Sequence, residues 1–176
     1  RIDGYEFNSN LFGEYNFSNL ASSITIGKFL DLSNKEIQEG LNKFLNDSNR
    51  SEILIFDSNK IYLDAYNANP TSMLAAISNF ENININNRVL ILGDMFELGE
   101  YSDQEHQKIV DFVTNKDYNK IYLVGDNFSK CNTDGEYFFK FSNTNELEKS
   151  DSFKSLKNMN ILVKGSRGVS LEKLFK

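Results

Sequence analysis

The stretch LDAYNANPTSM, residues 63–73, decides the fold, and it contains the chain's only proline, Pro70. An apolar run ends at Asp64, small and polar residues follow, and apolar residues at helical spacing come after Pro70. Asn69 is a favourable N-cap, and Pro70 suits the first helical position, where its missing N–H costs nothing. The stretch therefore predicts a strand, a loop and a helix. Such a helix N-terminus suits an anion, although an ordinary strand-to-helix connection without a ligand has the same pattern.

Strands on both sides of this stretch predict a sheet. Residues 53–56 and 60–63 flank a short polar turn, which predicts a hairpin and one antiparallel edge strand. Later apolar runs each end at glycine, as expected for parallel strands buried on both faces, and they cover residues 89–93, 121–125 and 161–165. Residues 137–141 predict another strand. The expected fold is a Rossmann-like, doubly wound α/β domain with a mostly parallel sheet.

The helices predicted around this sheet rest on apolar spacing and on capping residues. Two helices should precede the first strand, the second of them opened by a capping box of Ser33 and Glu36. Ser102 and Glu105 predict another capping box, at the start of a helix that carries His106 on its apolar face. A last helix is expected after residue 168.

Length and composition limit the possible functions. The 176 residues suffice for a sizeable core, and 40% of them are hydrophobic. The net charge of −6 argues against a nucleic-acid partner, and no apolar run is long enough for a membrane helix. The single cysteine, Cys131, cannot form an internal disulfide, so we expect a cytoplasmic protein. The start at Arg1 suggests the interior of a longer protein.

Three segments, in this order, resemble the Mur ligases. They are DAYNANPTSM at 64–73, GDMFELG at 93–99 with Ser102 and Glu105-His106 after it, and VKGSRG at 163–168. Within the family, the resemblance is to the branch that adds D-alanyl-D-alanine to UDP-MurNAc-tripeptide. Residues 13–19 resemble the end of the family's central ATPase domain, with Tyr15 where histidine is usual. The resemblance implies a helical remnant of that domain at 1–47 and a Mur ligase C-terminal domain at 48–176.

The resemblance also implies a nucleotide site. Asp64 corresponds to an aspartate that contacts the ribose of ATP, and Arg50 to an arginine that reaches the nucleotide, although Arg50 could also be a solvated linker charge. The implied ATP-binding residues are Asn16, Asn19, Arg50, Asp64 and Asn67. We expect the full-length enzyme to use ATP and Mg²⁺, with neither tightly bound by this chain and no metal site within it.

A second group of residues is implied on the D-alanyl-D-alanine side. Ligands of open parallel sheets bind outside the carboxyl ends of the strands, and polar residues of this chain gather there. Lys164 or Arg167 could bind the dipeptide carboxylate, or could instead form a salt bridge within the domain. Asn69 could be only a helix cap. The implied substrate-binding residues are Asn69, Asp94, Met95, Lys164, Ser166 and Arg167. We expect His106 to be a packed, hydrogen-bonded side chain and assign no chemistry to Cys131.

A missing motif limits what the chain could do alone. No Gly-x-x-x-x-Gly-Lys-Ser/Thr phosphate loop occurs in the 176 residues. The resemblance implies an ATP-dependent amide ligase that works through an acyl phosphate, together with its own N-terminal and central domains. We expect this chain to be an inactive C-terminal fragment of that enzyme with no catalytic residue. The alternatives are a noncatalytic α/β ligand-binding module and another Mur or folylpolyglutamate-type ligase.

Overall fold

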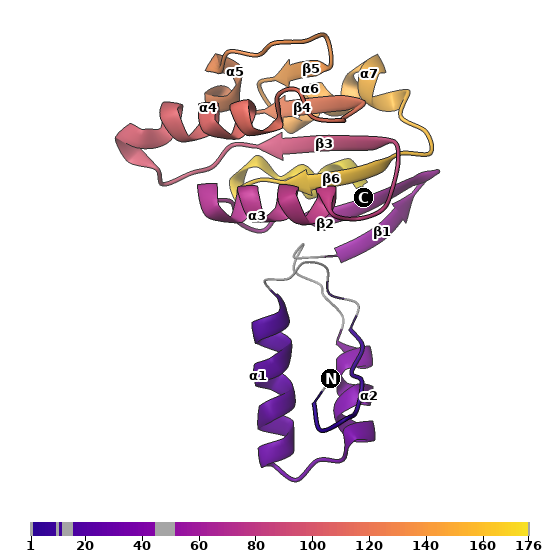
Figure 1. Cartoon of the computed structure of the whole chain (residues 1–176). Coiled ribbons are helices and arrows are strands. Elements are labelled where there is room, and N and C mark those ends of the chain that lie inside the picture. Colours follow the sequence, from indigo (N-terminus) through magenta and orange to yellow (C-terminus); the bar gives the residue numbers. More distant parts are fainter. Residues whose placement is uncertain (1, 10, 12–15, 45–51, 176) are drawn as a thin grey trace.

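The computed structural model describes residues 2–9, 11, 16–44 and 52–175 (Figure 1). The strands are β1 (Glu52–Phe56), β2 (Asn59–Asp64), β3 (Arg88–Gly93), β4 (Lys120–Val124), β5 (Phe138–Phe141) and β6 (Asn160–Lys164). The α-helices are α1 (Asn16–Phe29), α2 (Asn34–Lys43), α3 (Pro70–Glu81), α4 (Ser102–Val113), α5 (Asp126–Lys130), α6 (Thr144–Lys149) and α7 (Asp151–Lys154). Short 3-10 helices are η1 (Gly99–Tyr101), η2 (Arg167–Val169) and η3 (Leu171–Phe175).

One sheet organises the chain after residue 51. Its six strands have the order β1-β2-β6-β3-β4-β5, in which β1 and β2 pair antiparallel and all other pairs are parallel. This confirms the predicted mostly parallel sheet with one antiparallel edge strand. From β2 the chain proceeds through β3 and β4 to β5, and it then returns to place β6 between β2 and β3. The return creates a switch in strand order beside β6, the position where open α/β sheets bind ligands.

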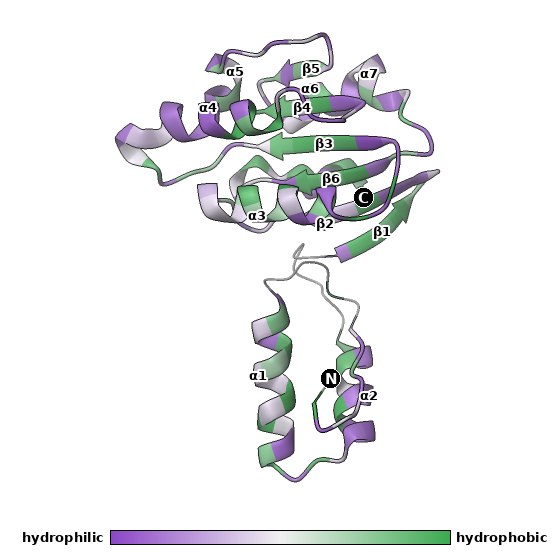
Figure 2. Cartoon of the chain, in the orientation of Figure 1, coloured by the Kyte–Doolittle hydropathy of each residue, from purple (hydrophilic) through white to green (hydrophobic). Residues whose placement is uncertain are grey.

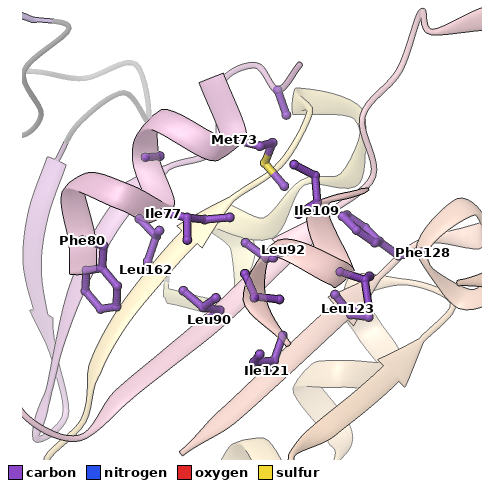
Figure 3. Close-up of a cluster of buried hydrophobic side chains, with 14 of the residues drawn as sticks. Met73, Ile77, Phe80, Leu90, Leu92, Ile109, Ile121, Leu123, Phe128 and Leu162 are labelled. Carbon is purple, nitrogen blue, oxygen red and sulfur yellow. The ribbon is translucent and has the colours of Figure 1, made fainter. Parts of the chain in front are cut away.

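Alternation of side chains along the strands gives the sheet two cores. On one face, Leu90, Leu92 and Leu162 pack with residues of α3 and α4, as Figure 3 shows. On the other face, Val89 and Ile91 pack with residues of α6 and η3. Figure 2 shows hydrophobic residues along the central strands. Successive residues of a strand point to opposite faces, so strands buried on both faces need near-continuous apolar runs.

The helix α3 begins as its sequence predicts. Asn69 is the N-cap, and its side chain accepts a hydrogen bond from the Ser72 amide at 2.8 Å, while the Asn69 amide donates to Ser72 Oγ at 3.1 Å. Pro70 is the first helical residue. Met73, Ile77 and two further apolar residues of the helix are buried against the sheet.

Two helix predictions near the sheet edge are wrong. Ser102 does not cap α4, because η1 runs directly into the helix and Tyr101 occupies the N-cap position without a side-chain bond. Where one α-helix is expected after residue 168, residues 167–175 form two 3-10 helices. Ser170 separates them with a left-handed backbone conformation, φ 58°, which interrupts a regular helix.

The helices α1 and α2 contact each other before the sheet begins. The predicted capping box of Ser33 and Glu36 is present at the start of α2. Gly27 permits a close approach of the helices, since a Cβ there would lie 2.9 Å from a side-chain carbon of Ile37. The predicted boundary at residues 47 and 48 lies outside the described residues and stays a prediction. In the described part of the chain, no helix is both long enough and apolar enough to span a membrane.

Candidate functional site

The register of the sheet places Asp64 beside Lys164. These residues are the last of β2 and β6, and they are partners in the parallel pairing of the two strands. Tyr62 and Leu162, two positions earlier, belong to the core on the α3 face. Because side chains alternate along a strand, Asp64 and Lys164 project from that same face, at the carboxyl edge of the sheet.

The two side chains form a buried ion pair. Lys164 Nζ donates to Asp64 Oδ2 at 2.7 Å and to the carbonyl oxygen of Asn67 at 3.1 Å. The side chain of Lys164 is 2% exposed and that of Asp64 is 10% exposed. A buried charge is costly to leave unpaired, so Lys164 depends on Asp64. Sequence reasoning assigned them to separate subsites, whereas the structure brings them together.

The loop between β2 and α3 uses its polar groups largely within itself. The Asn67 side chain accepts a bond from the Ala68 amide at 2.9 Å. Of the first helical residues, Pro70 has no N–H, and the amides of Ser72 and Met73 already donate to Asn69. The positive end of the helix dipole remains, but few amides are left to bind a phosphate.

A groove of about 640 Å³ opens above the ion pair. Two amide side chains at the start of α1, those of Asn16 and Asn19, line it together with the loop and the first turn of α3. The Asn19 amide nitrogen lies 3.5 Å from Asn16 Oδ1. The lining residues are Asn16, Asn19, Asp64, Tyr66, Asn67, Asn69, Pro70, Thr71, Ser72, Ala75 and Lys164. The predicted ATP-binding residues thus share one groove, except Arg50, which lies outside the described residues.

Lys164 and Arg167 are the two cations predicted to bind the dipeptide carboxylate, and Arg167 is the exposed one. It begins η2, directly after the β6 loop, and its guanidinium carbon lies 5.5 Å from the centre of the Tyr66 ring. An arginine over an aromatic face is held by the ring without losing its hydrogen-bond donors. The Arg167 side chain therefore remains able to bind a carboxylate, whereas Lys164 is committed to Asp64.

Asp94, Met95 and Ser166 face inward. The Asp94 carboxylate accepts the amides of Asn127 and Phe128, each at 2.9 Å, and Met95 is 1% exposed within the core. Ser166 Oγ accepts the Phe96 amide at 3.1 Å. These residues join the loops that follow β3 and β6, and any contact with a ligand would have to come through their backbone or their neighbours.

The histidine and the cysteine are both buried. His106 is 0% exposed and hydrogen-bonded on both ring nitrogens, which confirms the expected packed histidine. Burial raises the pKa of the Cys131 thiol to about 11, with the nearby Lys140 acting in the opposite direction. Such a thiol is a poor nucleophile at neutral pH. Among the described residues, no group of three or more acidic, histidine or cysteine side chains is placed to hold a metal ion.

Comparison with known proteins identifies the family. Residues 49–167 match the family described as "Mur ligase, glutamate ligase domain". The chain belongs to the Mur ligase family. It is 35% identical over 166 residues to a UDP-N-acetylmuramoyl-tripeptide–D-alanyl-D-alanine ligase of Buchnera aphidicola. The aligned region covers 92% of this chain and 36% of the relative. The chain spans about a third of the length of such relatives.

Two further comparisons agree with this assignment. A ligase of the same name from Borreliella burgdorferi is 32% identical over 179 residues, covering 97% of this chain and 38% of the relative. A solved D-alanyl-D-alanyl ligase structure from Acinetobacter baumannii superposes with a TM-score of 0.75 at 28% identity, over 92% of this Mur ligase chain and 36% of the other. The doubly wound fold predicted from the sequence is therefore that of a Mur ligase C-terminal domain.

Sequence reasoning missed two aromatic residues near the site. Tyr66 lies under Arg167 and lines the groove, and Phe96 is 46% exposed beside the β6 loop. Both occur within the motifs that this Mur ligase shares with its family. An aromatic residue between a buried strand and a helix could have been noticed, because most large apolar side chains elsewhere in this domain are buried.

Proposed function

We propose that this chain is the C-terminal part of an ATP-dependent ligase that adds D-alanyl-D-alanine to UDP-MurNAc-tripeptide. The observation that carries the proposal is the match of more than nine-tenths of the chain to ligases of that name. In the proposed reaction, ATP phosphorylates the tripeptide carboxylate, and the amine of D-alanyl-D-alanine attacks the acyl phosphate to form an amide. The enzyme would work in the cytoplasm, where ATP is available.

The groove would hold the sugar and base of ATP rather than its phosphates. Asp64 offers a carboxylate for ribose hydroxyls, and Asn16, Asn19 and Asn67 offer amides that can both donate and accept. The first turn of α3 has few amides left for a phosphate, and the 176 residues contain no phosphate loop. The phosphates and Mg²⁺ would therefore be held by the central domain of the full ligase.

The acceptor dipeptide would lie along the loops after β3 and β6. Arg167 is the exposed cation there, and its planar guanidinium can bind a carboxylate with two parallel hydrogen bonds. Lys164 would act through Asp64, by holding that carboxylate at the edge of the groove. The chain's share of catalysis would be the binding and orientation of the two substrates.

A ligation assay tests this function. The full-length protein should form UDP-MurNAc-pentapeptide from the tripeptide, ATP and D-alanyl-D-alanine, with one ADP released per amide. Residues 1–176 alone should give neither product, and should bind ATP more weakly than micromolar in calorimetry. A full-length protein that accepts glutamate, and not the dipeptide, would replace this proposal with a folylpolyglutamate-type activity. Ligation by residues 1–176 alone would refute the division of roles.

A further inference from the structure

The loop after β3 is attached to the loop after β6 through Ser166. The Ser166 amide donates to the carbonyl oxygen of Asp94 at 3.1 Å, and Ser166 Oγ accepts the Phe96 amide at 3.1 Å. The two strand ends approach so closely that a Cβ on Gly165 would lie 2.9 Å from the Cα of Gly93. The two loops therefore form one surface, and a displacement of either one moves the other.

His106 holds this surface from inside the domain. Its Nδ1 lies 2.7 Å from the carbonyl oxygen of Ser102, which can only accept, so Nδ1 carries the proton. In the neutral ring Nε2 is then unprotonated, and it accepts the Met95 amide at 3.0 Å. The ring also packs edge-on against Phe128, with centroids 4.6 Å apart. The imidazole is thus fixed in tautomer and orientation.

The Met95 amide depends on this one acceptor. His106 is 0% exposed and Met95 is 1% exposed, so water cannot replace the imidazole nitrogen without opening the core. Asp94 Oδ1 lies 3.6 Å from Nε2, but the Asp94 oxygens accept the amides of Phe128 and Asn127, whereas the Met95 amide donates to His106. A buried amide that loses its acceptor costs free energy, and the loop would shift to recover it.

The surface that would shift carries Phe96 and Arg167. Phe96 follows Met95 directly and is 46% exposed. Its ring lies against the backbone beside Arg167, since a Cβ on Gly168 would come within 2.6 Å of Phe96 Cε2. An apolar ring next to a cation matches a small apolar substrate with a carboxylate, such as a dipeptide of alanine.

We propose that His106 is a positioning residue for the acceptor dipeptide, because it fixes the Met95 amide and thereby the place of Phe96 relative to Arg167. This inference rests on the proposed ligase function and adds a residue that touches no substrate. His106 acts as a hydrogen-bond acceptor and not as an acid or base, so a side chain that keeps an acceptor at the Nε2 position should keep the loop in place.

Amide hydrogen exchange in residues 1–176 tests whether His106 holds the Met95 amide. His106→Phe keeps an aromatic ring, slightly larger than imidazole, but removes the acceptor. It should raise the exchange rate of the Met95 amide at least tenfold while the Ile91 amide in β3 stays protected. His106→Gln, which can place an oxygen near Nε2, should restore part of the protection. Val113→Ala removes buried volume at the other end of α4 and is the matched control. Equal protection of Met95 in His106→Phe and the wild type would overturn the inference.

Steady-state kinetics of the full-length ligase test the consequence. His106→Phe should raise the KM for D-alanyl-D-alanine about tenfold, with the KM for ATP changed less than twofold, and His106→Gln should recover most of the loss. Val113→Ala should leave both KM values unchanged. If the wild type ligates and His106→Phe has a normal dipeptide KM, the inference is wrong although the function stands. If the wild type does not ligate, the proposed function fails, and the positioning role fails with it.

Discussion

Replacement of Lys164 by methionine should destabilise the domain strongly. The substitution keeps most of the apolar stem but removes the ammonium group that donates to Asp64 Oδ2, in a side chain that is only 10% exposed. Breaking a buried ion pair from one side costs about 3–5 kcal/mol. Since Asp64 borders the groove and can gain some water, we expect about 3 kcal/mol. In a domain of this size that corresponds to a decrease in Tm of about 6–12 °C.

Urea unfolding of residues 1–176, followed by circular dichroism, measures this effect. The variants Lys164→Met, Asp64→Asn and the double substitution complete a cycle, and the double variant should be more stable than the sum of the single effects predicts, by at least about 1 kcal/mol. Lys108→Met is the matched control, because Lys108 pairs with Glu105 on the surface and should cost less than about 1 kcal/mol. A Lys164→Met variant as stable as the wild type, or additive effects in the cycle, would refute this reasoning and return Lys164 to the candidates for the dipeptide carboxylate.

Two further predictions concern Arg167 and Cys131. Arg167→Ala in the full-length ligase should raise the KM for D-alanyl-D-alanine by about ten- to a hundredfold, corresponding to about 1.4–2.8 kcal/mol, and leave the KM for ATP nearly unchanged. The dipeptide KM of Arg167→Lys should lie between those of the wild type and Arg167→Ala. An unaltered dipeptide KM in both variants would exclude the guanidinium as the carboxylate receptor. The Cys131 thiol, with its pKa raised from 9.0 to about 11 by burial, should react with iodoacetamide at pH 8 about a hundredfold more slowly in the folded chain than in urea, because only the thiolate reacts. The folded-state rate should rise about tenfold per pH unit up to about pH 11 as the thiolate forms, and equal rates in the folded and unfolded chain would contradict the assigned burial.

Local signals predicted the elements of this domain because each depends on residues close together in the chain. The N-cap of Asn69, the start of α3 at Pro70 and the apolar runs of the central strands each involve neighbours within a few positions. The hairpin of β1 and β2 follows from its short turn. The predicted cap at Ser102 is wrong because η1 leads directly into α4. Ser102 is therefore already inside the helix and does not stand before its first turn.

The arrangement of the site depended on contacts that the local sequence does not contain. Asp64 and Lys164 are a hundred residues apart, and they meet because β6 returns to lie between β2 and β3 in register with β2. Their burial then decides that the lysine pairs with the aspartate, while Arg167 stays exposed. In the same way, Asp94 follows a buried strand in the GDMFELG motif, but only the α5 amides of Asn127 and Phe128 decide that its carboxylate points inward. The sequence by itself determined which residues gather at the carboxyl edge of the sheet, and the tertiary structure decided their partners, since strand order and burial arise from the whole chain.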